Sequence, residues 1–235
     1  MIFSINRKAV VGAQKGKKKN RTGQVREKTS AYSGRTAVDH YTLQAQKEGY
    51  PARSVYKLEE IQKRFAVLPA DGHILDIGAA PGSWSLYILR NFLNRGTLCA
   101  VDLKPLALEE TPDNFIFLQG DFFDPAVLER LKSRGPFDAV LSDAAPDTTG
   151  NRTVDTGRSA ALAEGILDLA GAILVPGGSL TIKIFQGSGE QMLLSLFRKY
   201  FSGAWMFKPK ACRKESFETY LVGTGFKSAP EGEPG

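Results

Sequence analysis

Lys183 occupies an unusual position for a charged residue. It stands between Ile182 and Ile184 in the segment 180–185, whose composition is typical of a buried strand. A lysine is rarely buried without a partner, because removing an unpaired ammonium group from water is costly. Lys183 therefore either ends a strand and reaches solvent, or faces a cleft in which other charged groups neutralise it.

Three further charged residues are candidates for the same cleft. Lys57 lies on an amphipathic segment, and Asp143 follows an apolar one at 137–142. Glu218 stands among apolar and aromatic residues near the C-terminus. A Lys-Asp-Lys-Glu cluster would balance its own charge, and two ammonium groups in one cleft would lower the pKa of one lysine. A lysine that loses its proton easily can act as a general base.

A glycine-rich turn offers a binding site for a ligand. The apolar segment 73–77 is followed by Gly78-Ala-Ala-Pro-Gly82 and by Ser83, which we expect to cap a helix. Such a turn brings backbone N–H groups to a ligand. It lacks the Gly-x-Gly-x-x-Gly pattern of dinucleotide sites, and the chain has no Gly-Lys-Ser/Thr sequence for a triphosphate. A nucleoside without phosphate, such as S-adenosylmethionine, therefore fits better than NAD.

Four aspartates fall at the carboxyl ends of predicted strands: Asp76, Asp102, Asp121 and Asp143. A single aspartate of this kind is usually a turn former, but four in succession beside a glycine turn indicate a ligand site. Asp102 is placed to bind ribose hydroxyls, and Asp121 is placed to accept from an adenine amino group. We interpret Asp76 as bracing the turn.

The order of the elements predicts an α/β fold. We expect strands at 73–77, 97–101, 114–118, 137–142 and 179–185, and helices at 39–49, 53–65, 125–132, 156–174 and 190–201, with another helix after Ser83. Two last strands, 204–207 and 217–223, are expected to form an antiparallel edge hairpin. This alternation predicts a Rossmann-like, mostly parallel, doubly wound sheet.

Positive charge is concentrated at the N-terminus. Residues 1–35 hold ten of the 31 Lys and Arg residues and one of the 25 acidic residues, so the rest of the chain carries a net charge of −3. We predict a disordered basic arm at 1–35, one folded domain at 36–227 and a flexible end at 228–235. The arm suits a nucleic-acid backbone, or it is only a solubilising extension.

The composition excludes several classes of protein. Cys99 and Cys212 are too few for a disulfide scaffold, and His40 and His73 have no neighbours at metal-ligand spacing. No apolar run approaches the ~18 residues that span a bilayer, and the N-terminus has no signal-peptide core. We expect a cytoplasmic monomer without a metal ion, with Cys99 as a buried thiol.

Six motifs occur in chain order: Ser54-Val-Tyr-Lys-Leu, Leu75-Asp-Ile-Gly-Ala-Ala-Pro-Gly-Ser-Trp, Phe117-Leu-Gln-Gly-Asp-Phe, Leu141-Ser-Asp-Ala-Ala-Pro, Ile182-Lys-Ile-Phe-Gln-Gly and Ser216-Phe-Glu-Thr-Tyr. Together they resemble the FtsJ/RrmJ family of ribosomal RNA ribose 2′-O-methyltransferases, over residues 39–227. The resemblance implies a Rossmann-like methyltransferase fold and S-adenosylmethionine as the cofactor. It also implies that the acceptor is a uridine of the large-subunit ribosomal RNA, presented in an assembled or nearly assembled subunit.

The resemblance also assigns the site residues. It implies a catalytic tetrad of Lys57, Asp143, Lys183 and Glu218, and cofactor contacts by Gly82, Trp84, Asp102, Asp121 and Asp143. The chain departs from the family pattern in two places: the second glycine before the tryptophan is Ser83, and Asn-x-Ser-Gly is Asp147-Thr-Thr-Gly150. The second departure concerns RNA contacts and touches no member of the tetrad.

The implied reaction is in-line transfer of a methyl group to a ribose 2′-hydroxyl. Lys183 would be the general base and Asp143 would orient it. Lys57 would stabilise the developing alkoxide, and Glu218 would hold the lysines in place. The candidates for RNA contact are the basic residues Arg53, Lys63, Arg64, Lys208, Lys210, Arg213 and Lys214.

Three other functions stay open on the sequence alone. An amine methyltransferase would carry an Asn/Asp-Pro-Pro-aromatic segment where this chain has Asp143-Ala-Ala-Pro146. An NAD-dependent oxidoreductase is disfavoured by the glycine turn. A non-catalytic RNA-binding or ribosome-assembly factor would have no need of the four charged residues, although an added role in assembly is compatible with them.

Overall fold

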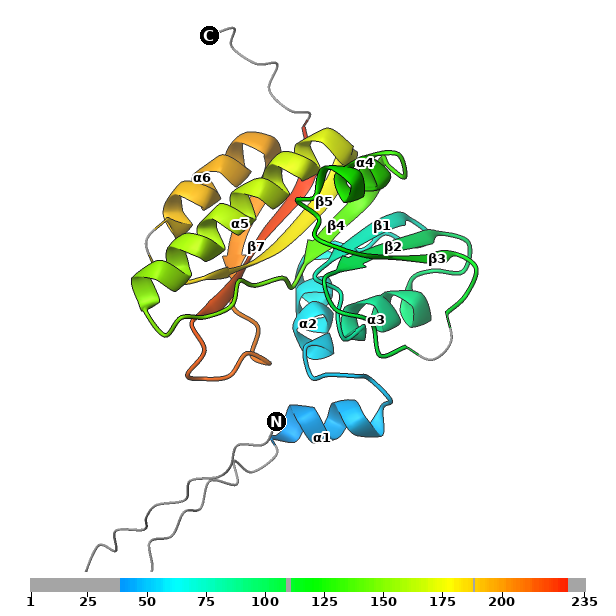
Figure 1. Ribbon diagram of the computed structural model, residues 1–235, viewed down its shortest axis with the longest axis horizontal. Coiled ribbons are helices and arrows are strands. Elements are labelled where there is room, and N and C mark those ends of the chain that lie inside the picture. Colours follow the sequence, from blue (N-terminus) through cyan, green and yellow to red (C-terminus); the bar gives the residue numbers. More distant parts are fainter. Residues whose placement is uncertain (1–38, 109–110, 188, 228–235) are drawn as a thin grey trace, which may run out of the picture. The chain divides into compact units, whose positions relative to one another are not determined.

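A seven-stranded sheet forms the centre of the computed structural model, which describes residues 39–108, 111–187 and 189–227. The strands are β1 (His73–Ile77), β2 (Thr97–Asp102), β3 (Phe115–Gln119), β4 (Phe137–Ser142), β5 (Leu174–Phe185), β6 (Phe201–Phe207) and β7 (Glu218–Phe226). Their order is β3-β2-β1-β4-β5-β7-β6 (Figure 1), with β1 to β5 parallel and β7 antiparallel to both neighbours. This confirms the predicted Rossmann-like sheet.

Helices cover both faces of the sheet. They are α1 (His40–Lys47), α2 (Val55–Phe65), α3 (Ser83–Asn91), α4 (Pro125–Lys132), α5 (Arg152–Ile173) and α6 (Glu190–Tyr200). α4, α5 and α6 lie on one face and α2 and α3 on the other (Figure 1), and each face has its own buried apolar cluster. Because both faces are covered, the central strands are apolar over most of their length, which explains their apolar runs.

β7 lies inside the sheet and not at its edge. The predicted antiparallel pairing of β6 with β7 is confirmed, but β7 inserts between β5 and β6, so β6 is the edge strand. Since β7 runs antiparallel to β5, its first residues lie at the carboxyl end of β5, where Glu218 pairs with Phe185 and Tyr220 pairs with Lys183. The insertion therefore brings the start of β7 next to Lys183.

The predicted start of α5, residue 156, was four residues too late. α5 begins at Arg152 because Asn151 caps it, accepting from the N–H groups of Thr153 and Val154 at 3.1 and 3.3 Å. Asp155, which precedes the predicted start, lies inside the first turn and accepts from the N–H of Thr149 at 2.7 Å. The side chain of Asp155 therefore fixes the loop after β4.

Two further local predictions were wrong. Ser83 does not cap α3: Gly82 is the N-cap, and the Ser83 hydroxyl accepts from the N–H of Ala52 at 2.7 Å. The segment before residue 179, expected as a turn, belongs to β5, which begins at Leu174 and has an irregularity in its register with β4. Both differences come from contacts between distant segments, which local patterns do not contain.

His73 and the two cysteines are packed into the fold. The ring of His73 stacks on Phe137 with 4.5 Å between centroids, and both cysteines are buried free thiols, as predicted for Cys99. Among the described residues no group of three side chains could hold a metal ion. No helix in the described part of the chain has the length and apolarity to cross a membrane. The predicted arm at 1–35 and end at 228–235 lie outside the described residues.

Candidate active site

Lys183 and Asp143 form an ion pair at the carboxyl ends of β5 and β4. Lys183 Nζ lies 3.1 Å from Asp143 Oδ1, and it also donates to the backbone carbonyl of Asp143. The two side chains are only 11% and 18% exposed. Lys183 is therefore largely buried beside a charged partner and does not reach out into solvent, which excludes the first of the two alternatives that its sequence position left open.

Lys57 and Glu218 form a second ion pair. Lys57 Nζ, from the first turn of α2, lies 2.9 Å from Glu218 Oε1 at the start of β7. The loop before β7 is fixed to α2 by Glu60, whose carboxylate accepts from the N–H groups of Lys210 and Ala211 at 2.8 Å each. α2 and β7 are thereby held together where the ion pair forms.

The two ion pairs interact electrostatically. Burial favours the neutral form of Lys57, but the carboxylates of Asp143 and Glu218 outweigh burial and raise the pKa of Lys57. Burial also opposes ionisation of Asp143, but the ammonium groups of Lys183 and Lys57 and a hydrogen bond from Tyr220 hold its pKa below the usual value. Lys57 and Asp143 are therefore both charged at neutral pH.

Tyr220 is a member of this cluster that the sequence analysis missed. Its hydroxyl donates to Asp143 Oδ1 at 2.7 Å, and its side chain is fully buried. Burial and the nearby carboxylates raise the pKa of Tyr220 well above its usual value, so the phenol stays protonated and remains a donor. The available signal was its two-residue spacing from Glu218, which places both side chains on one face of a strand.

The glycine turn after β1 passes close to the loop after β4. Gly78 and Gly82 have φ angles of 75° and 110°, in the left-handed region that favours glycine. A Cβ atom at Gly78 would lie 2.6 Å from the Cα of Ala144, and one at Gly82 would lie 2.8 Å from Leu108 Cγ. β1 and β4 are neighbours in the sheet although β2 and β3 separate them in the chain, so the turn marks the topological switch point.

The other candidate cofactor residues follow the same edge of the sheet. Asp102 accepts from the N–H groups of Ala80 and Lys104 at 2.8 Å each, and Asp121 accepts from the N–H of Phe123 at 2.9 Å. These bonds orient the carboxylates, whose remaining lone pairs are free for a ligand's hydroxyl or amino groups. Since β3, β2, β1 and β4 are consecutive, the two aspartates, the glycine turn and Asp143 extend over about 14 Å, at about 4.8 Å per strand.

Trp84 lies beneath the cleft. It is buried, its Nε1–H donates to the Ser54 carbonyl at 2.8 Å, and its ring lies 5.9 Å from that of Tyr220 between centroids. The indole N–H is thus used by the fold, and a ligand can meet only the ring of Trp84.

Asp76 is a further carboxyl group in this region. It is fully buried, its Oδ2 accepts from the Ser85 hydroxyl at 2.7 Å, and its Oδ1 has no hydrogen-bond partner among the described residues. Burial raises the pKa of Asp76 to about 7, and the nearby charges of Asp143 and Asp102 add to the effect. Asp76 is therefore closed to a ligand. The carboxylates of Asp102 and Asp121 are open to solvent and can accept from ribose hydroxyls and an adenine amino group, so the residues present fit S-adenosylmethionine.

Comparison with known proteins identifies the family. Residues 50–226 match the family described as FtsJ-like methyltransferase. The chain is also 52% identical over 190 residues to ribosomal RNA large subunit methyltransferase E of Treponema denticola, a match that covers 80% of this chain and 95% of the relative. The chain belongs to the FtsJ-like methyltransferase family. Membership confirms the predicted resemblance and S-adenosylmethionine as the methyl donor, and it rules out the oxidoreductase alternative.

Other relatives of this FtsJ-like methyltransferase carry the same name. The protein from Borreliella afzelii is 46% identical over 188 residues, covering 80% of this chain and 98% of the relative. Among solved structures, a protein from Plasmodium falciparum described as a ribosomal RNA methyltransferase has a TM-score of 0.66 at 28% identity, covering 77% of this chain and 100% of that one.

The basic candidates for RNA contact differ in their surroundings. Arg53 is largely buried: it pairs with Asp39 and donates to the carbonyl of Ala211, so it supports the fold. The exposed candidates lie at the end of α2 and in the loop before β7, namely Lys63, Arg64, Lys208, Lys210, Arg213 and Lys214. These six stay candidates for contact with RNA in this FtsJ-like methyltransferase.

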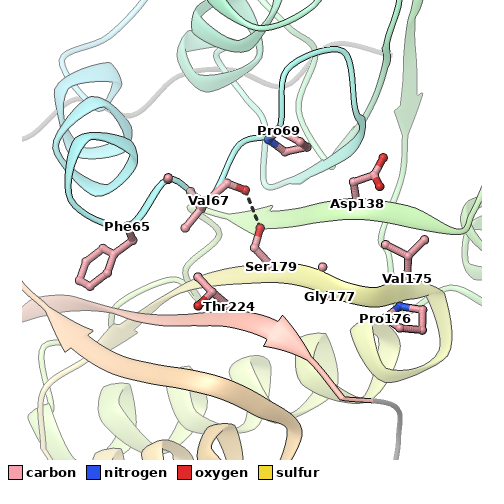
Figure 2. Close-up of a pocket in the computed structure, with 11 residues that line it drawn as sticks. Phe65, Val67, Pro69, Asp138, Val175, Pro176, Gly177, Ser179 and Thr224 are labelled. Carbon is pink, nitrogen blue, oxygen red and sulfur yellow. Dashed lines mark hydrogen bonds between the residues drawn. The ribbon is translucent and has the colours of Figure 1, made fainter.

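A hollow of about 330 Å³ lies at the opposite edge of the sheet, at the amino ends of β4 and β5 (Figure 2). Two of its polar side chains are used by the fold: Ser179 donates to the Val67 carbonyl at 2.6 Å, and Asp138 accepts from the N–H of His73 at 2.7 Å. The hollow is therefore separate from the tetrad, and its chemistry gives no reason to place catalysis there.

Proposed function

We propose that this protein transfers a methyl group from S-adenosylmethionine to the ribose 2′-hydroxyl of a uridine in large-subunit ribosomal RNA. The observation that carries the proposal is the Lys183–Asp143 ion pair, 3.1 Å long, at the edge of the sheet where the cofactor residues gather. The names of relatives that are 46–52% identical to this chain support the choice of substrate.

The cofactor supplies a methyl group made electrophilic by the sulfonium. The order of strands along the edge supports the following division of the cofactor's parts among this chain's residues. Asp121 accepts from the adenine amino group and Asp102 binds the ribose hydroxyls. Gly82 and Trp84 contact the methionine end, which leaves the methyl group facing Asp143.

Lys183 acts as the general base. It is effective only in its neutral form, so its ammonium proton must first pass to solvent. The Nζ atom then accepts the proton of the 2′-hydroxyl while Asp143 keeps the lysine in position. Lys57 stabilises the alkoxide charge, and Glu218 holds Lys57 at 2.9 Å.

Two contributions make the reaction feasible at neutral pH, where an alcohol is a poor nucleophile. General-base assistance contributes about 10²–10⁴-fold in rate. Holding the hydroxyl in line with the methyl group contributes up to about 7–11 kcal/mol of the barrier. An amine acceptor would need no base to make it nucleophilic when neutral, so the buried lysine pair favours a hydroxyl acceptor.

The experiment that tests the proposal is a map of ribose methylation on ribosomal RNA. Cells that lack the protein should lose 2′-O-methylation at one uridine of the large subunit and regain it with the wild-type gene. If no site of ribose methylation is lost, the proposed function is wrong. Purified protein, which we expect to act as a cytoplasmic monomer, should then be given free rRNA and large subunits in parallel to show which one it accepts.

A further inference from the structure

Three aromatic side chains form a strip on the outer side of the domain. Phe65 ends α2, and Trp205 and Phe207 lie on the edge strand β6. The ring centroid of Phe65 is 5.1 Å from that of Trp205 and 5.4 Å from that of Phe207. We call these three residues the aromatic strip. Phe65 and Phe207 are half-buried against the core, whereas Trp205 is 42% exposed.

Trp205 lies along the surface of β6. A Cβ atom at Gly203 would lie 2.1 Å from Cη2 of Trp205, so the ring occupies the space that a side chain at that position would fill. The Trp205 ring, which packs against Gly203 and Phe65 and is 42% exposed, offers part of a flat surface to solvent. Such a surface suits the stacking of another planar group.

The aromatic strip is also positively charged. The guanidinium of Arg64 lies over the rings of Phe65 and Phe207, at 5.5 and 5.3 Å from their centroids. The carboxylate of Glu60, one turn earlier on α2, is occupied by backbone N–H groups of the loop before β7. Aromatic rings interleaved with cations are the combination that binds single-stranded nucleic acid, because rings stack on bases and cations attract the phosphates.

The aromatic strip continues from the active site. Phe207 pairs with Tyr220, whose hydroxyl binds Asp143, and Trp205 pairs with Val222 two residues further along β7. At about 3.4 Å per residue, Trp205 lies about 7 Å beyond Phe207 along the strand. The hollow that Phe65 and Thr224 line comes after it in the same direction (Figure 2). An RNA strand with its target ribose at Lys183 would therefore have a neighbouring nucleotide within reach of the strip.

We propose that the aromatic strip stacks an unpaired base of the substrate RNA close to the methylated nucleotide, with Trp205 as the stacking surface. Arg64 and Lys208 contact the phosphates on either side. The identity of the RNA rests on the proposed function, whereas stacking of an unpaired base does not.

Kinetics with unmethylated large subunits test the role of Trp205. Replacing Trp205 by Ala should raise KM for the subunits about tenfold to a hundredfold, with kcat and S-adenosylmethionine binding unchanged, because only the stacking surface is lost. Trp205→Phe keeps an aromatic ring and should stay within about threefold of the wild type. Met192→Ala, an exposed apolar residue of α6 on the other face, is the matched control and should have no effect. A wild-type KM for Trp205→Ala would overturn the proposal, and so would a loss that Trp205→Phe shares in full.

Fluorescence provides a readout that does not depend on activity. The chain has two tryptophans, Trp205 and the buried Trp84, so a single-stranded oligouridylate should quench the wild-type emission and leave that of Trp205→Phe unchanged. Quenching without methyl transfer would sink the proposed function and keep the stacking site. Methyl transfer without quenching would overturn the stacking site and keep the proposed function. If Trp205→Ala instead dissolves a dimer seen by sedimentation, β6 is an interface between two copies and the proposal is wrong.

Discussion

Tyr220 and Lys183 share one oxygen of Asp143. The Tyr220 hydroxyl donates to Asp143 Oδ1 at 2.7 Å, and Lys183 Nζ lies 3.1 Å from the same atom. The two residues face each other across the β5–β7 ladder, so the antiparallel insertion of β7 produces this arrangement. Asp143 is thereby fixed by two donors, the ammonium of Lys183 and a phenol whose raised pKa keeps it protonated.

Removing the Tyr220 hydroxyl should change how the stability of the protein depends on pH. In Tyr220→Phe, Asp143 loses a hydrogen bond that lowers its pKa, so that pKa rises towards its usual value of 3.8. A carboxylate with a depressed pKa loses its contribution to stability as pH falls through that pKa, so the difference in stability between the wild type and Tyr220→Phe should shrink at acid pH. A hydrogen bond to a charged group contributes about 1.5–3 kcal/mol, so the free energy of unfolding at pH 7 should fall by a similar amount.

The matched control is Tyr56→Phe, which removes a hydroxyl that donates to Glu48 Oε2 at 2.9 Å outside the tetrad. It should lower stability while methyl transfer stays unchanged. If the loss of stability in Tyr220→Phe does not shrink at acid pH, Tyr220 does not stabilise the Asp143 carboxylate.

The Lys57–Glu218 pair predicts a compensating double variant. Lys57→Met leaves the Glu218 carboxylate partly buried near Asp143 without its cation, and should cost about 3–5 kcal/mol in urea denaturation. Adding Glu218→Gln removes the uncompensated charge, so the double variant should regain most of that stability while methyl transfer stays lost. If the two losses of stability simply add, the pair is not coupled as the structure indicates.

Asp76 predicts that stability falls with rising pH. Its pKa is raised to about 7 from 3.8, so between these values the folded state keeps a proton that the unfolded state has lost. The free energy of unfolding should therefore decrease by up to about 1.4 kcal/mol per pH unit in this window. Asp76→Asn replaces the carboxyl by an uncharged group of the same shape, so the variant lacks this pH dependence. Its stability relative to the wild type should grow from pH 5 to pH 7 in chemical denaturation. A difference that does not depend on pH would contradict the raised pKa.

The close approach of the glycine turn to the loop after β4 predicts that alanine costs more stability at Gly78 than at Gly177, although both glycines have a left-handed backbone. Gly177 has a φ of 84°, and no atom lies within 4 Å of a Cβ placed there. Gly177→Ala should therefore lower the free energy of unfolding only by the backbone strain, about 1–3 kcal/mol. Gly78→Ala adds a contact of 2.6 Å with the backbone of Ala144 and should lose more stability than that. It should also weaken S-adenosylmethionine binding in calorimetry. Equal effects of the two changes would show that the turn and the β4 loop do not meet closely.

The sequence predicted those parts of the site that depend on residue type and strand order. Lys183 between isoleucines needed a partner, and Asp143 at the end of the neighbouring strand provides it. The glycine turn and Asp102 follow from the rule that ligands bind at the carboxyl ends of parallel strands. Most elements of the sheet could be placed within a few residues, since apolar runs mark buried strands.

The rest depended on contacts between distant segments. Tyr220 was missed because its role requires the β5–β7 pairing, which no local pattern specifies. The predicted start of α5 was four residues too late because its first turn, Arg152-Thr-Val-Asp155, is mostly polar and lacks the apolar spacing on which the prediction rested, although Asn151 is a good capping residue. Ser83 was assigned to the cap of α3, although its hydroxyl instead binds the N–H of Ala52, 31 residues away.

The most direct test of the account concerns the proton acceptor. Lys183→Ala removes the base, and Lys183→Arg keeps a positive charge beside Asp143 in a group that does not give up its proton. Single-turnover methyl transfer to unmethylated large subunits, with cofactor binding measured in parallel, separates chemistry from folding. We predict a loss of at least about a hundredfold in rate for both variants, with nearly unchanged affinity for S-adenosylmethionine. A variant that folds and keeps more than about a tenth of the wild-type rate would contradict the role of Lys183 as general base.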